Sequence, residues 1–149
     1  MLSIAHAPTG ALIATKIPNP IISLPLVLLS HYLEDRVPHW DVGVGMNKGP
    51  ERKRTAFFQE LLIDGPLSVL LVYFFFQYGH TEFVWRAWLG WFIGLLPDFL
   101  EFPINFLGIK VYPLNKLSGL HHWFHRSTTN KFWGLLPQFI VILIVYSLR

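Results

Sequence analysis

Residues 133–148 read WGLLPQFIVILIVYSL, a run without a charged side chain that stops just before Arg149. A helix that crosses a membrane needs about 20 mostly apolar residues, within a range of roughly 17–25. Residues 132–148 have this length. So do residues 56–78, which include LSVLLVYFFFQY, and residues 83–102, which include WLGWFIGLLPDFL. The sequence therefore predicts a membrane protein built from helices.

Two further apolar stretches lie near the start of the chain. Residues 20–33 reach the length of a span if the helix extends through Glu34 and Asp35. Residues 2–17 are less apolar and contain Pro8 and Gly10, so they form either a short span or a re-entrant segment. We expect an all-α, polytopic membrane helix bundle of four or five spans, in which residues 1–149 form a single integral membrane domain.

The composition supports this class and excludes others. Hydrophobic residues make up 52% of the chain and charged residues only 14%, against about 25% charged residues in an average soluble domain. There is no cysteine, which excludes disulfides and thiolate metal sites. The net charge is only +3, and the one dense basic run is 48–54. We therefore expect no nucleic-acid partner.

The basic residues predict an orientation, because Lys and Arg gather in cytoplasmic loops. The link between the second and third stretches carries Lys48, Arg52, Lys53 and Arg54. The link 103–131 carries Lys110, Lys116, Arg126 and Lys131, whereas the link 77–82 has no Lys or Arg. We therefore expect a multi-pass protein of the cytoplasmic (inner) membrane, with both basic links inside.

This orientation places most of the histidines and several carboxylates at the cytoplasmic interface, with only His80 on the opposite side. The residues that converge are His6, His31, Glu34, Asp35, His39, Asp41, Asp98, Glu101, His121, His122 and His125. The predicted orientation depends only on Lys and Arg, not on any histidine or carboxylate. Their convergence therefore indicates, independently, a polar site that faces the cytoplasm.

The spacing of these residues suits a metal ion. On a helix, Asp35 follows His31 at i+4, and His125 follows His121 at i+4, so each pair shares one face. With no thiolate available, a divalent ion that accepts nitrogen and oxygen ligands is expected, zinc or manganese above others. The predicted ligands are His6, His31, Asp35, Asp98, His121, His122 and His125. Pro97 is expected to kink its helix and to turn Asp98 inward.

Three residues are candidates for catalysis. Glu34 or Glu101 could accept a proton, and Arg126 could pair with a phosphate oxygen. His39 and Asp41 follow Pro38 on either side of Trp40. We expect these two residues to lie in a water-exposed loop at the interface and not to be ligands.

Three short motifs resemble the YdjM-like family of predicted membrane-bound metal-dependent hydrolases. The first is His6 with Gly10 in AHAPTGALIA, and the second is LLPDFLE, with Asp98 as its first acid and Glu101 one place from the family's second. The third is HRSTTN at 125–130, in which Asn130 stands where the family has histidine. The resemblance implies metal-dependent hydrolysis at the membrane.

The leading functional hypothesis is a membrane-embedded metal-dependent hydrolase that acts on a lipid-like or phosphate ester. Its partners would be membrane lipid and the lipid-like substrate, and the sequence leaves the oligomeric state open. One alternative is a small membrane transporter or adaptor with a metal- or proton-binding polar cluster. A second alternative is a histidine-box diiron oxygenase, since HHWFH at 121–125 resembles a reversed hydroxylase box.

Overall fold

The computed structural model describes residues 1–109 and 111–149. Within these residues every regular element is a helix, and the only β-type pairing is one isolated bridge between His39 and Ser127. The all-α class is therefore confirmed. Lys110, one of the basic residues used to orient the chain, lies outside the described residues.

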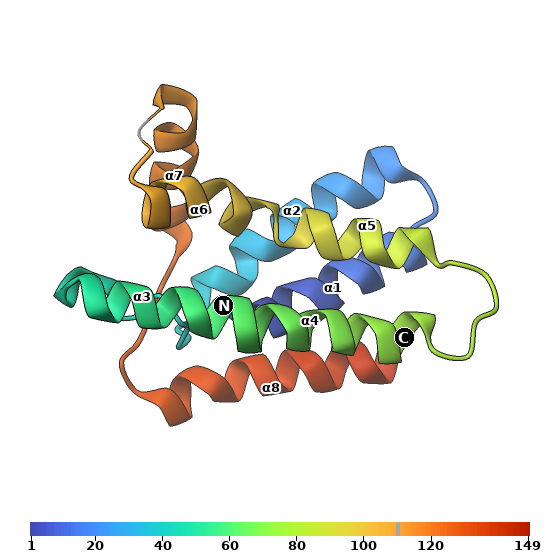
Figure 1. The fold of residues 1–149 in the computed structure, drawn as a ribbon. Helices are drawn as coiled ribbons and strands as arrows, with labels where there is room; N and C mark the ends of the chain where they lie inside the picture. Colours follow the sequence, from blue (N-terminus) through green and yellow to red (C-terminus); the bar gives the residue numbers. More distant parts are fainter. Residues whose placement is uncertain (110) are drawn as a thin grey trace.

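The N-terminal helix α1 lies at the centre of the molecule (Figure 1). It packs against four helices, α2, α4, α5 and α8. The bounds of these five helices are Ser3–Lys16 (α1), Pro20–Arg36 (α2), Gly65–Val72 (α4), Trp85–Gly94 (α5) and Lys131–Leu148 (α8). Most of α1 is buried, so the element expected to be the weakest span is the core of the bundle.

Glycines allow α5 to cross very close to α1. A Cβ atom added at Gly90 would collide with the main-chain oxygen of Gly10, and a Cβ added at Gly10 would collide with that of Gly90. Small residues at a helix crossing let two backbones approach in this way. The contact continues at Gly94, where an added Cβ would lie 3.0 Å from the carbonyl oxygen of His6.

Two helices are long and apolar enough to cross a membrane. One is the continuous helix Pro50–Gln77, of 28 residues, and the other is α8, of 18 residues. Only 17% of the apolar window in each is buried inside the protein, so most of each surface is free to face lipid. The long helix consists of α3 (Pro50–Gln59), a π-helical turn, α4 and a second π-helical turn.

A third span is present if two bent helices count as one. Helix α5 is followed by α6 (Leu96–Leu107) at an angle of 43°. The bend lies directly before Pro97, as expected, since proline cannot donate the helical hydrogen bond. Residues 1–109 and 111–149 thus contain two, or up to three, such helices. The total of four or five spans stays a prediction: α1 has 14 residues, and α2 has 17, of which Glu34, Asp35 and Arg36 are charged.

Helix α7 (Tyr112–Phe124) packs against α6 and, with it, projects from one end of the bundle (Figure 1). The chain then passes through 125–130 to the start of α8. These connections bring the end of α2, the end of α7 and the start of α6 to one end of α1, where the polar residues gather.

Candidate metal centre

The carboxylate of Asp35 lies at the centre of a buried group of histidines. Its Oδ2 atom is 2.6 Å from His121 Nε2 and 3.4 Å from His31 Nε2. Its Oδ1 atom is 3.1 Å from His6 Nε2 and 3.6 Å from His39 Nε2. We call these five residues the Asp35 cluster. The side chain of Asp35 is completely buried, and imidazoles from four segments of the chain surround it.

Three of these imidazoles are held through their other ring nitrogen. In each, Nδ1 lies at hydrogen-bond distance from an oxygen that can only accept, so Nδ1 carries a hydrogen and Nε2 is the nitrogen turned toward the cluster. This is the usual environment of a metal-ligating histidine. The contacts are His6 Nδ1 to Glu34 Oε2 at 2.7 Å, His31 Nδ1 to Gly94 O at 2.7 Å, and His39 Nδ1 to Val37 O at 2.8 Å.

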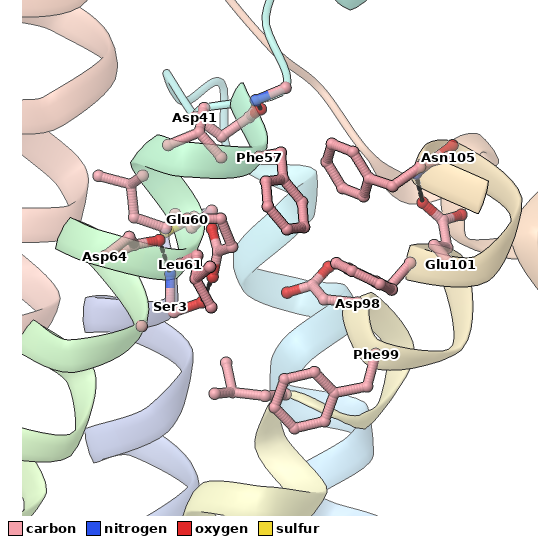
Figure 2. Close-up of a pocket in the computed structure, with 18 of the residues that line it drawn as sticks. Ser3, Asp41, Phe57, Glu60, Leu61, Asp64, Asp98, Phe99, Glu101 and Asn105 are labelled. Carbon is pink, nitrogen blue, oxygen red and sulfur yellow. Dashed lines mark hydrogen bonds between the residues drawn. The ribbon is translucent and has the colours of Figure 1, made fainter. Parts of the chain in front are cut away.

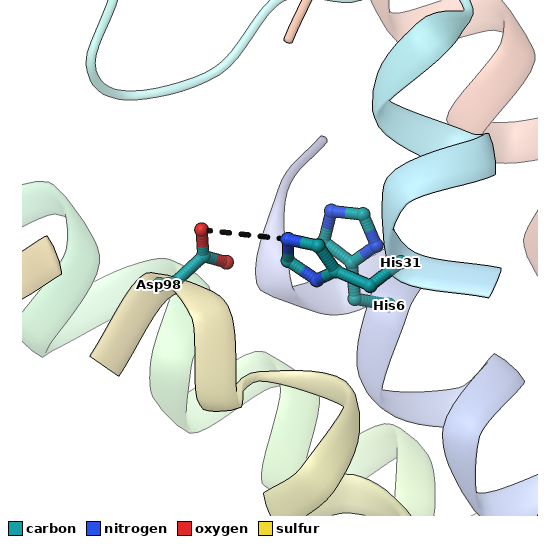
Figure 3. A group of neighbouring side chains, drawn as sticks. All are labelled: His6, His31 and Asp98. Carbon is teal, nitrogen blue, oxygen red and sulfur yellow. Dashed lines mark ion pairs between the residues drawn. The ribbon is translucent and has the colours of Figure 1, made fainter. Parts of the chain in front are cut away.

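Helix α6 adds Asp98 to the cluster. Asp98 Oδ1 lies 3.8 Å from Nε2 of both His31 and His121, and these two nitrogens are 3.3 Å apart. Figure 3 shows Asp98 reaching toward His31, whose ring stacks on that of His6 with centroids 3.9 Å apart. The Asp98 side chain is 36% exposed, so it lies at the border between the buried cluster and solvent.

In the part of the chain that the structure describes, three groups of side chains have ligand atoms close enough to hold one metal ion. They are His6 with His31 and Asp98, His31 with Asp35 and His121, and Asp35 with His39 and His125. The predicted metal-binding character is thus matched by buried histidine and aspartate groups of suitable geometry. Asp35 belongs to two of the three groups.

The loop after α2 differs from the expectation that it is exposed to water. His39 is fully buried and Asp41 is only 7% exposed. Main-chain hydrogen bonds fasten this loop to the segment after α7: His39 N donates to Arg126 O at 3.0 Å, and Thr128 N donates to His39 O at 2.7 Å. The prediction that His39 and Asp41 form a solvated loop was therefore wrong, because a distant segment covers them.

The remaining predicted residues occupy different places. His125 faces His39, with their Nε2 atoms 3.1 Å apart. The side chain of His122 is 66% exposed, and its Nδ1 atom lies 3.1 Å from Glu101 Oε1. The side chain of Arg126 is exposed, while its main-chain N–H donates to the carbonyl oxygen of Asp35 at 2.9 Å.

The cluster adjoins a cavity of about 660 Å³ (Figure 2). One wall is the long helix Pro50–Gln77 and the opposite wall is α6. Apolar side chains dominate both walls, among them Phe57, Leu61, Phe99 and Phe102. His121, His125, Asp41 and Asp98 also line the cavity. The polar cluster is therefore accessible from an apolar space between two helices.

Two carboxylates in the cavity wall were missed from the sequence. Glu60 and Asp64 lie one turn apart in the long helix. Asp64 accepts hydrogen bonds from Ser3 N at 2.6 Å and Ile4 N at 3.1 Å, so it caps the start of α1 from another helix. The signal that could have revealed them is a pair of carboxylates at i, i+4 inside an apolar stretch.

The histidines on the cavity side differ in protonation. Burial disfavours the charged form of His121, but the carboxylates of Asp35 and Glu101 outweigh burial and raise its pKa to about 10. At His125, burial dominates and lowers the pKa to about 4. His125 is therefore neutral at pH 7, which leaves an imidazole nitrogen free to act as a ligand.

The cluster attracts cations. The Met1 amino group contacts Asp35 Oδ1 and lies 2.8 Å from His6 Nε2. Glu34, Asp98 and Glu101 surround the imidazoles with further negative charge. Buried carboxylates are costly unless positive charge compensates them, so this site favours bound cations.

Comparisons of the chain with protein-family models, with curated proteins and with solved structures found no match. The resemblance to the YdjM-like family therefore stays a prediction that rests on the three motifs alone.

Proposed function

We propose that the protein is a membrane-embedded, metal-dependent hydrolase that acts on a lipid-like or phosphate ester. The observation that carries this proposal is the position of the Asp35 cluster, whose His121 and neighbouring Asp98 form part of the wall of an apolar cavity. The cavity suits the hydrocarbon part of an amphipathic ester, and the cluster suits the chemistry of its polar end.

The donor set fits a divalent metal. His31, His121, Asp35 and Asp98 offer nitrogen and carboxylate oxygen atoms, the ligands that zinc and manganese accept. The hydrogen bond from His31 Nδ1 to Gly94 O fixes the ring so that Nε2 faces these partners. When bound, such an ion lowers the pKa of a coordinated water and polarises an ester.

Glu101 is the best placed proton acceptor. It lines the cavity, and its buried Oε1 atom lies 3.1 Å from His122 Nδ1 and 3.3 Å from His121 Nδ1. Asn105 Nδ2 donates to its other oxygen at 3.3 Å, which holds the side chain in place. Glu34, the other candidate, lies behind His6 and outside the cavity lining. We assign it to orienting His6.

The proposal includes a position in the membrane. We put the cluster on the cytoplasmic side, which the basic residues of 48–54 support. The substrate would enter from the bilayer between the long helix Pro50–Gln77 and α6. Leu61 and Phe99, which line the cavity, are also exposed on the surface, as a route from lipid requires. Arg126, exposed beside His125, would contact a phosphate group.

The test is hydrolysis of short-chain phosphate and carboxylic esters in mixed micelles with added zinc or manganese. We expect metal-dependent turnover that Asp35→Asn abolishes together with metal binding. Glu101→Gln should lower turnover by about 10²–10⁴-fold, the usual contribution of a general base, while bound metal is retained. Glu51→Gln, on the exposed start of α3, is the matched control. Turnover that survives Asp35→Asn would contradict the proposal.

A further inference from the structure

We propose that the site holds two metal ions, the second bound by His39, Asp41 and His125, with the carboxylate of Asp35 bridging the pair. This second site uses two residues that the sequence placed in a solvated loop. It goes beyond the proposed function, because it is a statement about metal binding that holds whether or not the protein hydrolyses an ester.

The three side chains of the second site converge on one point. Asp41 Oδ2 lies 3.4 Å from His39 Nε2 and 3.5 Å from His125 Nε2. The two imidazole nitrogens are 3.1 Å apart. Asp35 Oδ1 completes the group at 3.6 Å from His39 Nε2. Ligand atoms that surround one ion at about 2.0–2.2 Å are separated by distances of this size.

One buried acceptor among these atoms has no donor. His39 Nδ1 donates to Val37 O, and His39 Nε2 lies at hydrogen-bond distance from His125 Nε2. This pairing leaves the Oδ2 atom of Asp41 without a donor. Asp41 Oδ2 is buried and has no hydrogen-bond partner in the described part of the chain. Buried acceptors without donors are costly, and a cation among them removes that cost.

Asp35 is placed to join the second site to the first. Its Oδ2 atom faces His121 and His31, while its Oδ1 atom lies 3.1 Å from His6 Nε2 and 3.6 Å from His39 Nε2 and contacts the Met1 amino group. In two-metal enzymes the ions lie about 3.5–4 Å apart, a separation that the two oxygens of one carboxylate can span. One carboxylate with different imidazoles at each oxygen is the arrangement expected of such a bridge.

The fold holds the second site rigidly. Both main-chain groups of His39 are bonded to one segment, its N–H to Arg126 and its C=O to Thr128. Trp40 N then donates to Gly134 O at 3.1 Å, and Gln138 Nε2 donates to Trp40 O at 2.7 Å. A loop fastened in this way at successive residues keeps His39 and Asp41 in position before an ion arrives.

The test uses the full chain, purified in detergent, stripped of metal and reloaded with Mn²⁺. Elemental analysis after removal of free ion gives the number of ions per chain, and electron paramagnetic resonance shows whether they are coupled. We expect two ions per chain with an exchange-coupled spectrum. Asp41→Asn, which keeps the shape of the side chain, should retain one ion with an uncoupled six-line spectrum. His80→Ala, in an exposed loop, is the control and should retain two.

Three outcomes would overturn the second site: one ion per wild-type chain, two ions in folded Asp41→Asn, or no coupling between two ions. The number of ions bound per wild-type chain tests the second site even if Asp41→Asn fails to fold, and His125→Ala provides a second variant. Two coupled ions without ester hydrolysis would support this site and count against the proposed hydrolase. One ion per chain together with ester hydrolysis would support the proposed hydrolase and count against the second site.

Discussion

The carbonyl oxygen of Gly94 lies 2.7 Å from Nδ1 of His31 and accepts its hydrogen bond at the point where α5 ends. The next residues bend the chain into α6, so the same break that frees this carbonyl group also brings Asp98 toward the cluster. The kink at Pro97 therefore has two effects on the site. It orients one candidate ligand, and it supplies another.

The close crossing of α1 and α5 should be sensitive to a single methyl group. We expect Gly90→Ala to lower the free energy of unfolding by about 1–3 kcal/mol, the usual cost of overpacking, because the new Cβ meets the backbone of Gly10. Gly119→Ala is the matched control, since nothing lies within 4 Å of a Cβ there. Thermal unfolding in detergent measures both, and equal melting temperatures would refute the prediction.

Glu34 should act on metal affinity through His6. We expect Glu34→Gln to weaken metal binding by about 10–100-fold, the usual effect of removing a partner of a ligating histidine, because the charge-assisted contact at 2.7 Å is lost. Competition with a chelating indicator dye measures this affinity. Glu51→Gln, on an exposed surface, should leave it unchanged. An unchanged affinity in Glu34→Gln would remove His6 from the metal centre.

Metal binding should strengthen as the pH rises. In the metal-free protein His121 has a pKa of about 10, so it is protonated at pH 7, and an ion at this position must displace the proton. Affinity should therefore increase by about tenfold per pH unit for one displaced proton, up to the pKa. Calorimetric titrations in two buffers of different ionisation enthalpy would detect the released proton. Identical apparent enthalpies would contradict the prediction.

The number of bound ions should determine whether phosphate or carboxylic esters are hydrolysed faster. Pairs of metal ions stabilise the attacking and leaving oxygens of in-line displacement at phosphorus. If both the hydrolase and the second site hold, turnover of phosphate esters should exceed that of carboxylic esters with the same chain. The comparison needs one micelle composition and one metal concentration. A clear preference for carboxylic esters would show that the hydrolase and the two-ion site are not both correct.

The long apolar stretches and part of the site could be predicted from sequence. Residues 132–148 and 56–78 lie in helices of membrane-spanning length. Their side chains are apolar, and a helix satisfies its own backbone hydrogen bonds, as an apolar surrounding requires. The spacing of His31 and Asp35 placed them on one helix face, and their ligand atoms lie 3.4 Å apart. These features depend only on residues close together in the chain.

His39 and Asp41 could not be assigned in this way. Pro38 and Trp40 suggest an irregular loop, and irregular loops are usually exposed. What buries these two residues is a main-chain pairing with residues 126–128, which leaves no pattern in either segment. The same limit applies to Asp64. Its partners are main-chain N–H groups of α1, and main-chain groups leave no pattern in a sequence.

The pairing of His39 with residues 126–128 also sets an order of events during synthesis. His6, His31 and Asp35 leave the ribosome early, whereas the segment that fastens His39 emerges only after the long helix and the α5–α6 pair. Until then the loop at 37–41 has no backbone partner on that side. The second metal site is thus completed only after residues 126–128 have been made, so the capacity to hold both ions reports that the chain has folded at least as far as the start of α8.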